Sequence, residues 1–265
     1  MHGGRDVVDA DYERRMMEDR SRFVDMVDLK NGLKVLDAGT GHGLFAIYIA
    51  RRIKSNGLLV AIDVSSEHVR QANALLKKEK FSFAHVVKAD LRWVPIASDS
   101  LDAVMSYDFL CSVNSPSTLP KVFLEAKRIL KNEGTMIMVD YAPKPENAHE
   151  SLFYQRFSIF EKVYAQAGKS LHLTFFNSKK IESLLKTLGF SVKTEVIERD
   201  VWMPKCALRK EMQELTKSMK REAVNQSVRA QLTKELHDFY KRAKERKTKV
   251  PSARLITAKL RKNKD

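Results

Sequence analysis

Several features are scarce or missing in this chain of 265 residues, and each absence excludes a class of protein. Only two cysteines occur, Cys111 and Cys206, so neither a disulfide framework nor a zinc cluster with local ligand spacing is expected. No run of about eighteen apolar residues is present, which predicts that no helix spans a membrane. Residues 1–5 are not followed by an apolar stretch, so we expect no secretory signal. Together these absences favour a cytoplasmic protein without a metal site.

The charge of the chain is positive and unevenly distributed. The formal net charge is +15, and 43% of the residues are hydrophobic, which is enough for a sizeable core. Residues 1–203 contain 29 Lys and Arg against 26 Asp and Glu, whereas residues 204–265 contain 19 against 7. A concentrated basic surface attracts nucleic acid, anionic lipid or acidic protein, but it also occurs simply as a solvated surface. Nucleic acid or an acidic protein is therefore a candidate partner through residues 204–265.

The most informative stretch is a glycine-rich loop at residues 39–43. An apolar run ends at Asp37, glycine follows at every second position from Gly39 to Gly43, and a helix is expected over 44–53. Glycine tolerates positive φ and has no Cβ to block a ligand, and the N-terminus of the helix offers free N–H groups. This pattern of strand, loop and helix is typical of a nucleotide site.

Three alternatives for this loop can be compared on spacing. A dinucleotide fingerprint requires Gly-x-Gly-x-x-Gly, but here the third glycine comes one residue early and Leu44 takes its place. A phosphate-binding loop requires a lysine after the glycines, and none follows. An ordinary turn without a ligand does not need three alternating glycines. The spacing therefore disfavours a nicotinamide oxidoreductase.

Strand and helix patterns alternate along most of the chain. Strands are expected at 34–37, 58–63, 83–88, 101–106, 135–141, 190–197 and 253–260. Helices are expected at 44–53, 66–80, 119–130 and 178–188. Such alternation predicts an α/β fold with a doubly wound, mostly parallel sheet, whose ligands bind at the carboxyl ends of the strands. The last strand alternates and ends in basic residues, which favours an edge strand.

The motif formed by Asp37, Gly39, Gly41 and Gly43 resembles motif I of the class I S-adenosylmethionine-dependent methyltransferases. The whole pattern is closest to the branch called methyltransferase type 11. The resemblance covers residues 30–142 well, and 176–198 and 252–262 more loosely. It implies seven strands with an antiparallel last strand, S-adenosylmethionine as cofactor and S-adenosylhomocysteine as product.

Acids at the ends of the next two strands extend the predicted site. Asp63 ends the second strand beside the glycine loop, where a carboxylate accepts hydrogen bonds from ribose hydroxyls; the alternative is a cap for the helix that follows. By resemblance, Asp90 accepts from the adenine amino group and Leu91 packs on the ring, although Asp90 also suits a turn. Asp37 resembles the acid that faces the methionine amino group. The expected cofactor site is Asp37, Gly39, Thr40, Gly41, Gly43, Asp63, Val64, Asp90, Leu91 and Ser106.

A general base is required only if the methyl acceptor must lose a proton. Tyr107 and Asp108 are the preferred catalytic candidates, and Tyr154 and His172 are weaker ones. The segment that begins Ser106-Tyr107-Asp108-Phe109 lacks the Asn/Asp-Pro-Pro-Tyr/Phe element of enzymes that methylate exocyclic amines of nucleic acid. Cys111 follows leucine, so the Pro-Cys nucleophile of RNA cytosine-C5 enzymes is also missing.

Three regions are expected: a helical lead-in at 1–30, a methyltransferase domain at 31–203 and 250–265, and a basic helical insert at 204–249. Apolar residues recur at helical spacing in the insert, at Leu208, Met212, Leu215, Met219, Val228, Leu232, Leu236 and Phe239. With the aromatic segment 143–175, the insert is expected to emerge at the carboxyl edge of the sheet as a cap. The sequence thus predicts methyl transfer to a small or lipid-like acceptor under this cap. The alternatives are an RNA or protein methyltransferase that uses the insert to hold its substrate, and a non-catalytic cofactor-binding module.

Overall fold

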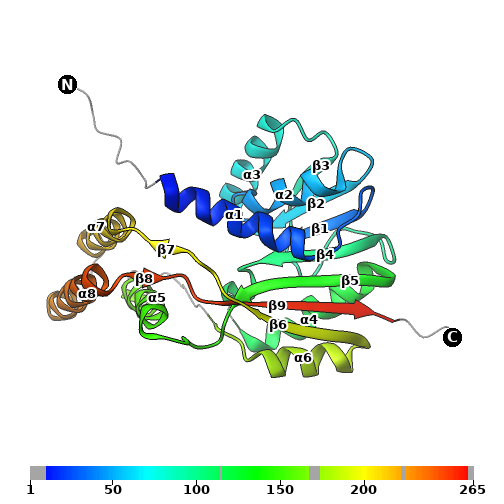
Figure 1. The fold of residues 1–265 in the computed structure, drawn as a ribbon. Coiled ribbons are helices and arrows are strands. Elements are labelled where there is room, and N and C mark those ends of the chain that lie inside the picture. Colours follow the sequence, from blue (N-terminus) through cyan, green and yellow to red (C-terminus); the bar gives the residue numbers. More distant parts are fainter. Residues whose placement is uncertain (1–9, 114, 167–173, 222–224, 262–265) are drawn as a thin grey trace. The chain divides into compact units, whose positions relative to one another are not determined.

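The computed structural model describes residues 10–113, 115–166, 174–221 and 225–261 (Figure 1). The chain divides into two compact units. Of the described residues, unit 1 contains 10–18, 142–166, 198–221 and 225–252, and unit 2 contains 19–113, 115–141, 174–197 and 253–261. Helix α1 (Ala10–Met26) contributes residues to both units.

Unit 2 is built on a seven-stranded sheet with the strand order β3-β2-β1-β4-β5-β9-β6. Its strands are β1 (Lys34–Ala38), β2 (Leu58–Asp63), β3 (Ala84–Lys88), β4 (Leu101–Tyr107), β5 (Leu130–Tyr141), β6 (Phe190–Ile197) and β9 (Ala253–Leu260). The neighbours from β3 to β5 pair in parallel, and β9 is antiparallel to both β5 and β6. The predicted fold class, with an antiparallel last strand, is confirmed.

The prediction that residues 253–260 form an edge strand is wrong. Strand β9 pairs on both sides, with β5 through Thr135↔Lys259 and with β6 through Phe190↔Leu260, so β6 is the edge strand. The basic end of β9 has a local explanation, because Lys259 forms an ion pair of 2.7 Å with Glu133 on β5. Alternation with a charged end therefore does not distinguish an edge strand from an internal antiparallel one.

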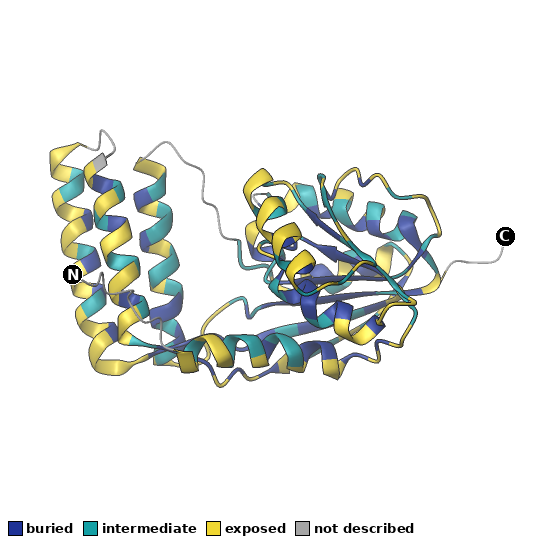
Figure 2. Ribbon diagram, turned by 90° about the horizontal axis from the view of Figure 1, so that it is seen from above, coloured by how far each residue is buried: buried dark blue, intermediate teal, exposed yellow. Residues whose placement is uncertain are grey.

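Helices cover both faces of this sheet, and adjacent strand residues point into different cores. Val35 packs in a cluster with Phe23 of α1 and with residues of α2 (Leu44–Ile53) and α3 (Ser66–Lys78). Leu36 packs in a second cluster with residues of α4 (Leu119–Ile129) and α6 (Ser178–Thr187). In Figure 2 the strands are mostly dark blue, and the outer faces of the helices are yellow. This two-sided burial is what a parallel sheet requires.

Two helices of unit 2, α3 and α6, begin with a side-chain cap. Ser65 caps α3, and its hydroxyl accepts from the His68 N–H at 3.3 Å. Asn177 caps α6, because its side chain accepts from the Lys179 N–H at 2.9 Å. Two short 3-10 turns that were not predicted, η1 (Leu110–Ser112) and η2 (Pro116–Thr118), follow β4.

Unit 1 contains α5 (Ala148–Gln166), α7 (Lys205–Arg221), α8 (Gln226–Arg246) and a ribbon of β7 (Trp202–Met203) paired with β8 (Thr248–Lys249). The predicted apolar stripes of the insert are packed inside the unit: Leu208, Leu215, Met219, Leu232, Leu236 and Phe239 are all buried. Arg156 of α5 lies 4.3 Å over the Phe153 ring and forms an ion pair of 2.8 Å with Glu211 of α7. The compact unit is therefore larger than the expected insert at 204–249, because α5 packs with both insert helices.

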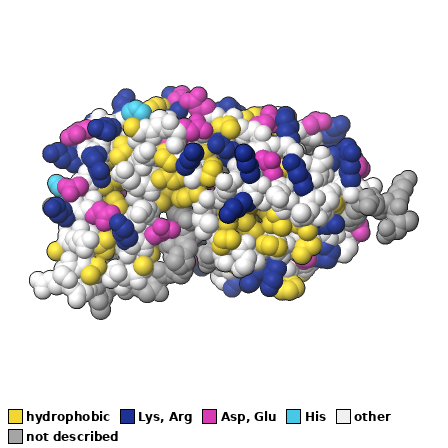
Figure 3. All heavy atoms as spheres, turned by 90° about the horizontal axis from the view of Figure 1, so that it is seen from below, with side chains coloured by type: hydrophobic (Ala, Val, Ile, Leu, Met, Phe, Trp, Pro, Cys, Tyr) yellow, Lys and Arg dark blue, Asp and Glu magenta, His cyan; other side chains and the backbone are white. Residues whose placement is uncertain are grey.

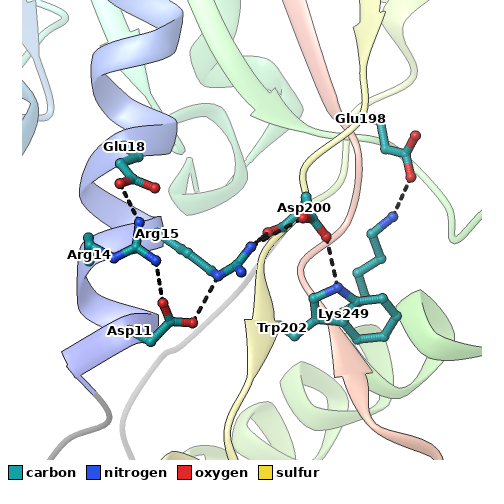
Figure 4. A network of polar contacts seen from close by, with 8 residues as sticks. All are labelled: Asp11, Arg14, Arg15, Glu18, Glu198, Asp200, Trp202 and Lys249. Carbon is teal, nitrogen blue, oxygen red and sulfur yellow. Dashed lines mark hydrogen bonds and ion pairs between the residues drawn. The ribbon is translucent and has the colours of Figure 1, made fainter.

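Polar contacts also join the first half of α1 to the β7 strand within unit 1 (Figure 4). Arg15 donates to Asp11 on its own helix and forms an ion pair of 3.1 Å with Asp200. Asp200 in turn accepts from the Trp202 indole N–H at 2.9 Å. Lys249 on β8 forms an ion pair of 2.5 Å with Glu198. The ion pairs of Arg15 are partly exposed, so each adds little stability.

The basic residues of the insert are mixed with acidic ones. Lys217 pairs with Glu214 at 2.9 Å, and Glu235 pairs with Lys162 of α5 at 2.5 Å. Figure 3 shows Lys and Arg side chains spread over one face of the molecule, with Asp and Glu side chains among them.

Within the described part of the chain, we find no helix with the length and apolar character needed to cross a bilayer.

Candidate functional site

The glycine loop leaves β1 and is held against the end of β2. The N–H groups of Gly39 and Thr40 each donate to the Ile62 carbonyl at 2.9 Å, and the Gly41 N–H donates to Asp63 Oδ2 at 2.9 Å. The loop closes with a bond of 3.0 Å from the Gly43 N–H to the Thr40 carbonyl. These bonds fix the loop before any ligand is added.

All three glycines have left-handed backbone, with φ of +73° at Gly39, +55° at Gly41 and +82° at Gly43. A Cβ on Gly39 would lie 2.3 Å from Cδ2 of Phe109, and a Cβ on Gly43 would lie 3.0 Å from Cα of Ala72. A Cβ on Gly41 would meet nothing within 4 Å. Two glycines are thus required by packing within the protein, and Gly41 leaves open space in the direction from which a ligand approaches.

Alanine at Gly41 and alanine at Gly39 are therefore expected to behave differently. Gly41→Ala should cost only about 1–2 kcal/mol for the left-handed conformation, or a few degrees of melting temperature, and should fill ligand space. Gly39→Ala must also displace the Phe109 ring and should destabilise more. Thermal unfolding monitored by circular dichroism, with S-adenosylhomocysteine titration of each folded variant, tests this. Equal melting temperatures for the two variants would contradict the packing assigned to Gly39.

A cleft of about 720 Å³ opens beside this loop, within unit 2. It is lined by most of the residues expected at the cofactor site and by several others: Arg20, Asp37, Gly39, Thr40, Gly41, His42, Leu44, Phe45, Asp63, Val64, Ser65, His68, Ala89, Asp90, Leu91, Arg92, Tyr107, Asp108, Phe109, Ser112, Val113, Thr118 and Val122. Of the expected residues, Gly43 packs below the loop on α3, and Ser106 lies deeper, beside a small apolar cavity. The volume is in the range of small-molecule and cofactor sites.

Asp37 is the most perturbed acid of the cleft. It is 1% exposed, and burial raises its pKa to about 7, with the charge of Asp63 adding to the rise and the Thr40 hydroxyl opposing it. Its Oδ2 has no hydrogen-bond partner among the described residues, and neither does the buried hydroxyl of Ser106. Buried polar atoms without partners cost free energy, so this end of the cleft is suited to a polar or cationic ligand group.

Asp63 is anchored at the end of β2 and still faces the cleft. Its Oδ1 accepts from the Ser65 N–H at 2.9 Å and lies 3.2 Å from Nδ1 of His68, whereas Oδ2 accepts from Gly41. The carboxylate can accept further hydrogen bonds, because two oxygens offer about four lone pairs. The capping alternative is partly correct, since Asp63 bonds to the cap residue Ser65, but it leaves room for a ligand.

Asp90 is already paired in this structure. Arg92 Nε lies 3.0 Å from both of its oxygens and Arg92 Nη2 lies 2.6 Å from Oδ2. The Arg92 hydrogen bonds hold the pKa of Asp90 below its usual range. An adenine amino group would therefore share this carboxylate with Arg92. Leu91 is 9% exposed and Val64 is 63% exposed, and both line the cleft.

Tyr107 belongs to the wall of the cleft. Its hydroxyl donates to the buried carboxylate of Asp19, and its ring packs against Phe45 at 5.2 Å between centroids. The guanidinium of Arg20 lies 4.9 Å from the Tyr107 ring centroid and also lines the cleft. The tyrosine thus positions α1 at the cleft, and Arg20 brings a positive charge to it.

The remaining base candidates lie in different places. Asp108 lines the cleft in left-handed backbone, with φ of +52°. Tyr154 belongs to unit 1, where its hydroxyl donates to the Ala142 carbonyl. His172 lies outside the described residues. Of the four base candidates, the structure therefore places Tyr107 and Asp108 at the cleft.

Sequence reasoning missed several residues of the cleft. His68 is one turn into α3 and touches Asp63, and its ring centroid lies 4.9 Å from that of His42. The sequence offers one signal for His68, which is its position five residues after the strand-end acid Asp63, at the start of a helix. Arg20 had no local signal, because its position depends on how α1 packs on Tyr107.

The chemistry of the cleft fits S-adenosylmethionine. The cofactor carries an ammonium and a sulfonium cation, a ribose diol and an adenine ring. Orphaned Asp37 Oδ2 suits the ammonium, Asp63 suits the diol, and the apolar contact of Leu91 suits the ring. The open space at Gly41 allows a close approach.

Comparison with known proteins agrees with this chemistry. A family model described as a methyltransferase domain matches residues 29–244. The chain is similar to an arsenite methyltransferase of Aquipseudomonas alcaligenes, with 31% identity over 119 residues, 42% of this chain and 34% of that protein. It is also similar to phosphoethanolamine N-methyltransferase 3 of Arabidopsis thaliana, with 26% identity over 186 residues, 69% of this chain and 33% of that protein. The chain thus matches about a third of the length of these curated relatives.

Solved structures show the same fold. A cyclopropane-fatty-acyl-phospholipid synthase-like protein from Lactobacillus casei superposes with a TM-score of 0.72 at 17% identity, covering 94% of this chain and 92% of that one. Phosphoethanolamine N-methyltransferase 2 of Haemonchus contortus, solved with phosphomonomethylethanolamine and S-adenosylhomocysteine, gives 0.57 at 19% identity, covering 93% and 53%. The chain therefore belongs to the methyltransferase domain family and has the class I fold, with S-adenosylmethionine as its cofactor.

Proposed function

We propose that this protein transfers the methyl group of S-adenosylmethionine to a small-molecule acceptor in the cleft of unit 2. The observation that carries the proposal is the position of three acids, Asp37, Asp63 and Asp90, at the carboxyl ends of three neighbouring strands around one glycine loop. Acids near a cationic ligand favour its binding. When bound, the cofactor supplies a methyl group already activated as a sulfonium, so alignment and exclusion of water are the main requirements.

Each residue of the cleft has a proposed part in this reaction. Asp37 accepts from the ammonium of the ligand, and Asp63 accepts from the ribose hydroxyls. Leu91 excludes water from one face of the adenine ring. Asp108, which lines the cleft, would accept a proton from an acceptor that must lose one.

The size of the cleft and the relatives both support a small acceptor. The cleft of about 720 Å³ has room for a cofactor and a compact second molecule. Relatives are named for arsenite, phosphoethanolamine and sterol substrates, which are small molecules. A sterol-like acceptor would be lipid-like, and an amine or metalloid acceptor would be polar.

Methyl-labelled S-adenosylmethionine incubated with the chain and a fractionated cell extract tests the proposal. We expect label in the low-molecular-weight or lipid fraction, and none with Asp63→Ala. Label in RNA or protein would contradict a small acceptor and favour the insert as a substrate-binding surface. Tight cofactor binding without transfer to any fraction would contradict catalysis and favour a non-catalytic cofactor-binding module.

A further inference from the structure

Cys111, at the centre of the turn η1, is held by contacts with three different parts of unit 2. Its N–H donates to Asp140 Oδ2 at 3.2 Å, and its Sγ donates to the Asp108 carbonyl at 3.2 Å. Its carbonyl accepts from the Thr174 N–H at 2.8 Å. These contacts tie η1 to the end of β5, to the end of β4 and to the segment before α6.

The turn and the residues beside it form one wall of the cleft. Asp108, Phe109, Ser112 and Val113 all line it, and the Phe109 ring lies directly over Gly39. The position of η1 therefore determines where Asp108 and Phe109 stand in the cleft. The backbone of Asp108 is itself left-handed, so this wall has an uncommon conformation that its surroundings must maintain.

Asp140 is the buried side chain of β5 that contacts this turn. It is 7% exposed, and its second oxygen accepts from the Tyr141 N–H at 2.9 Å. Burial raises its pKa to about 7, the negative charge of Asp108 adds to the rise, and the surrounding backbone N–H groups oppose it. A buried carboxylate beside another acid is unfavourable for global stability, so its presence calls for a local reason.

We infer that Asp140 is a positioning residue, which holds η1 by accepting the Cys111 N–H and thereby sets Asp108 and Phe109 at the cleft. This inference rests on the proposed function for the role of the cleft, but the geometry it invokes is independent of any ligand. The two cysteines of the chain provide a direct readout, because Cys111 is buried in this turn and Cys206 is exposed on α7.

The test measures how fast 5,5′-dithiobis(2-nitrobenzoic acid) labels Cys111 at pH 8 in a Cys206→Ser background. Asp140→Leu keeps the branching at Cγ, is larger and has no acceptor, whereas Asp140→Asn has nearly the same volume and keeps one acceptor of two. We expect labelling to accelerate by about tenfold or more in the Leu variant and by less in the Asn variant, because losing a hydrogen bond to a charged acceptor shifts local opening by that order. Asp102→Asn is the matched control, since Asp102 also accepts a backbone N–H, from Lys34 at 2.8 Å, away from the cleft.

Two further measurements separate positioning from a general structural role. Asp140→Leu leaves the N–H groups of Cys111 and Tyr141 without this acceptor, so its melting temperature should fall. At temperatures where the variant is folded, Cys111 labelling should accelerate and S-adenosylhomocysteine should bind several-fold more weakly, whereas Asp102→Asn should show neither change. If the Leu variant does not fold, the comparison of Asp140→Asn with Asp102→Asn carries the test. Unchanged Cys111 protection in the folded Asp140 variants would overturn the inference. If wild-type protein binds no S-adenosylhomocysteine, the proposed function fails, and the labelling rates still decide the role of Asp140.

Discussion

Replacing Asp63 by alanine is expected to weaken S-adenosylhomocysteine binding by about 100-fold or more at pH 7.5. Two ribose hydrogen bonds to a charged acceptor are each worth about 1.5–3 kcal/mol, and each 1.4 kcal/mol corresponds to about a factor of ten in affinity. The substitution also releases the Gly41 N–H, which Asp63 Oδ2 holds at 2.9 Å. Both losses act on the nucleoside end of the cleft.

Asp102→Ala is the control for this experiment, because Asp102 also accepts a backbone N–H, at the amino ends of strands β1 and β4. It accepts from the Lys34 N–H at 2.8 Å and pairs with Lys131 at 2.6 Å. We expect this variant to lose stability and to keep its affinity, whereas Asp63→Asn should fall between wild type and Asp63→Ala. Isothermal titration calorimetry measures all four affinities. Wild-type affinity in folded Asp63→Ala would remove the basis of the nucleoside assignment.

The second large effect is expected at Asp37 and depends on pH. In the folded protein the pKa of Asp37 is raised to about 7 from an ordinary value of 3.8, so the folded state retains a proton that the unfolded chain has released. The contribution of this group to stability is therefore greatest below about pH 4, decreases as the pH rises toward 7, and is constant above that. Between pH 3.8 and about 7, at about 1.36 kcal/mol per pH unit, the free energy of unfolding contributed by this group falls by about 4 kcal/mol at most.

Asp37→Asn removes this dependence. The variant should be more stable than wild type at pH 8 and similar to it near pH 4, because asparagine carries no charge to bury. Asp140 titrates in the same direction in both proteins and so cancels from the comparison. Urea unfolding at half-unit steps between pH 4 and pH 8 measures the difference. Parallel pH profiles for wild type and variant would show that Asp37 ionises normally.

Ligand binding should respond to the same group with the opposite sign. The ammonium of S-adenosylhomocysteine favours ionised Asp37, so affinity should rise with pH up to about 7 and level off. In Asp37→Asn the affinity should be low and nearly independent of pH over this range. Stability and affinity that change in opposite directions with pH identify a buried acid whose charge is needed for binding rather than for folding.

Those parts of the fold that depend on local pattern were predictable from the sequence. The order of strands and helices in unit 2 follows from alternation and capping, and Asp37, Asp63 and Asp90 meet because carboxyl ends of parallel strands share one edge. Strand β9 was misplaced because its pattern is the same for an internal antiparallel strand. The ribbon of β7 and β8 could not be seen, because each strand has only two residues.

The site was predictable to the extent that its residues follow strands. Gly39, Gly41, Asp63 and Leu91 lie at such positions, and the structure brings them to one cleft. Arg20 depends on long-range packing of α1, and the Asp90–Arg92 pair depends on side-chain conformations. Asp140 is not predicted, because it lies near the end of the mostly buried strand β5 and no local pattern marks it.

Titration of S-adenosylhomocysteine into the wild-type chain at pH 7.5 tests whether this cleft binds the cofactor. We expect one saturable site per chain, with an affinity far above that for a nicotinamide dinucleotide. The reason is that the acids of the cleft suit an ammonium and a ribose rather than a pyrophosphate. Absence of heat and of any shift in melting temperature at millimolar ligand would contradict the assignment of this cleft.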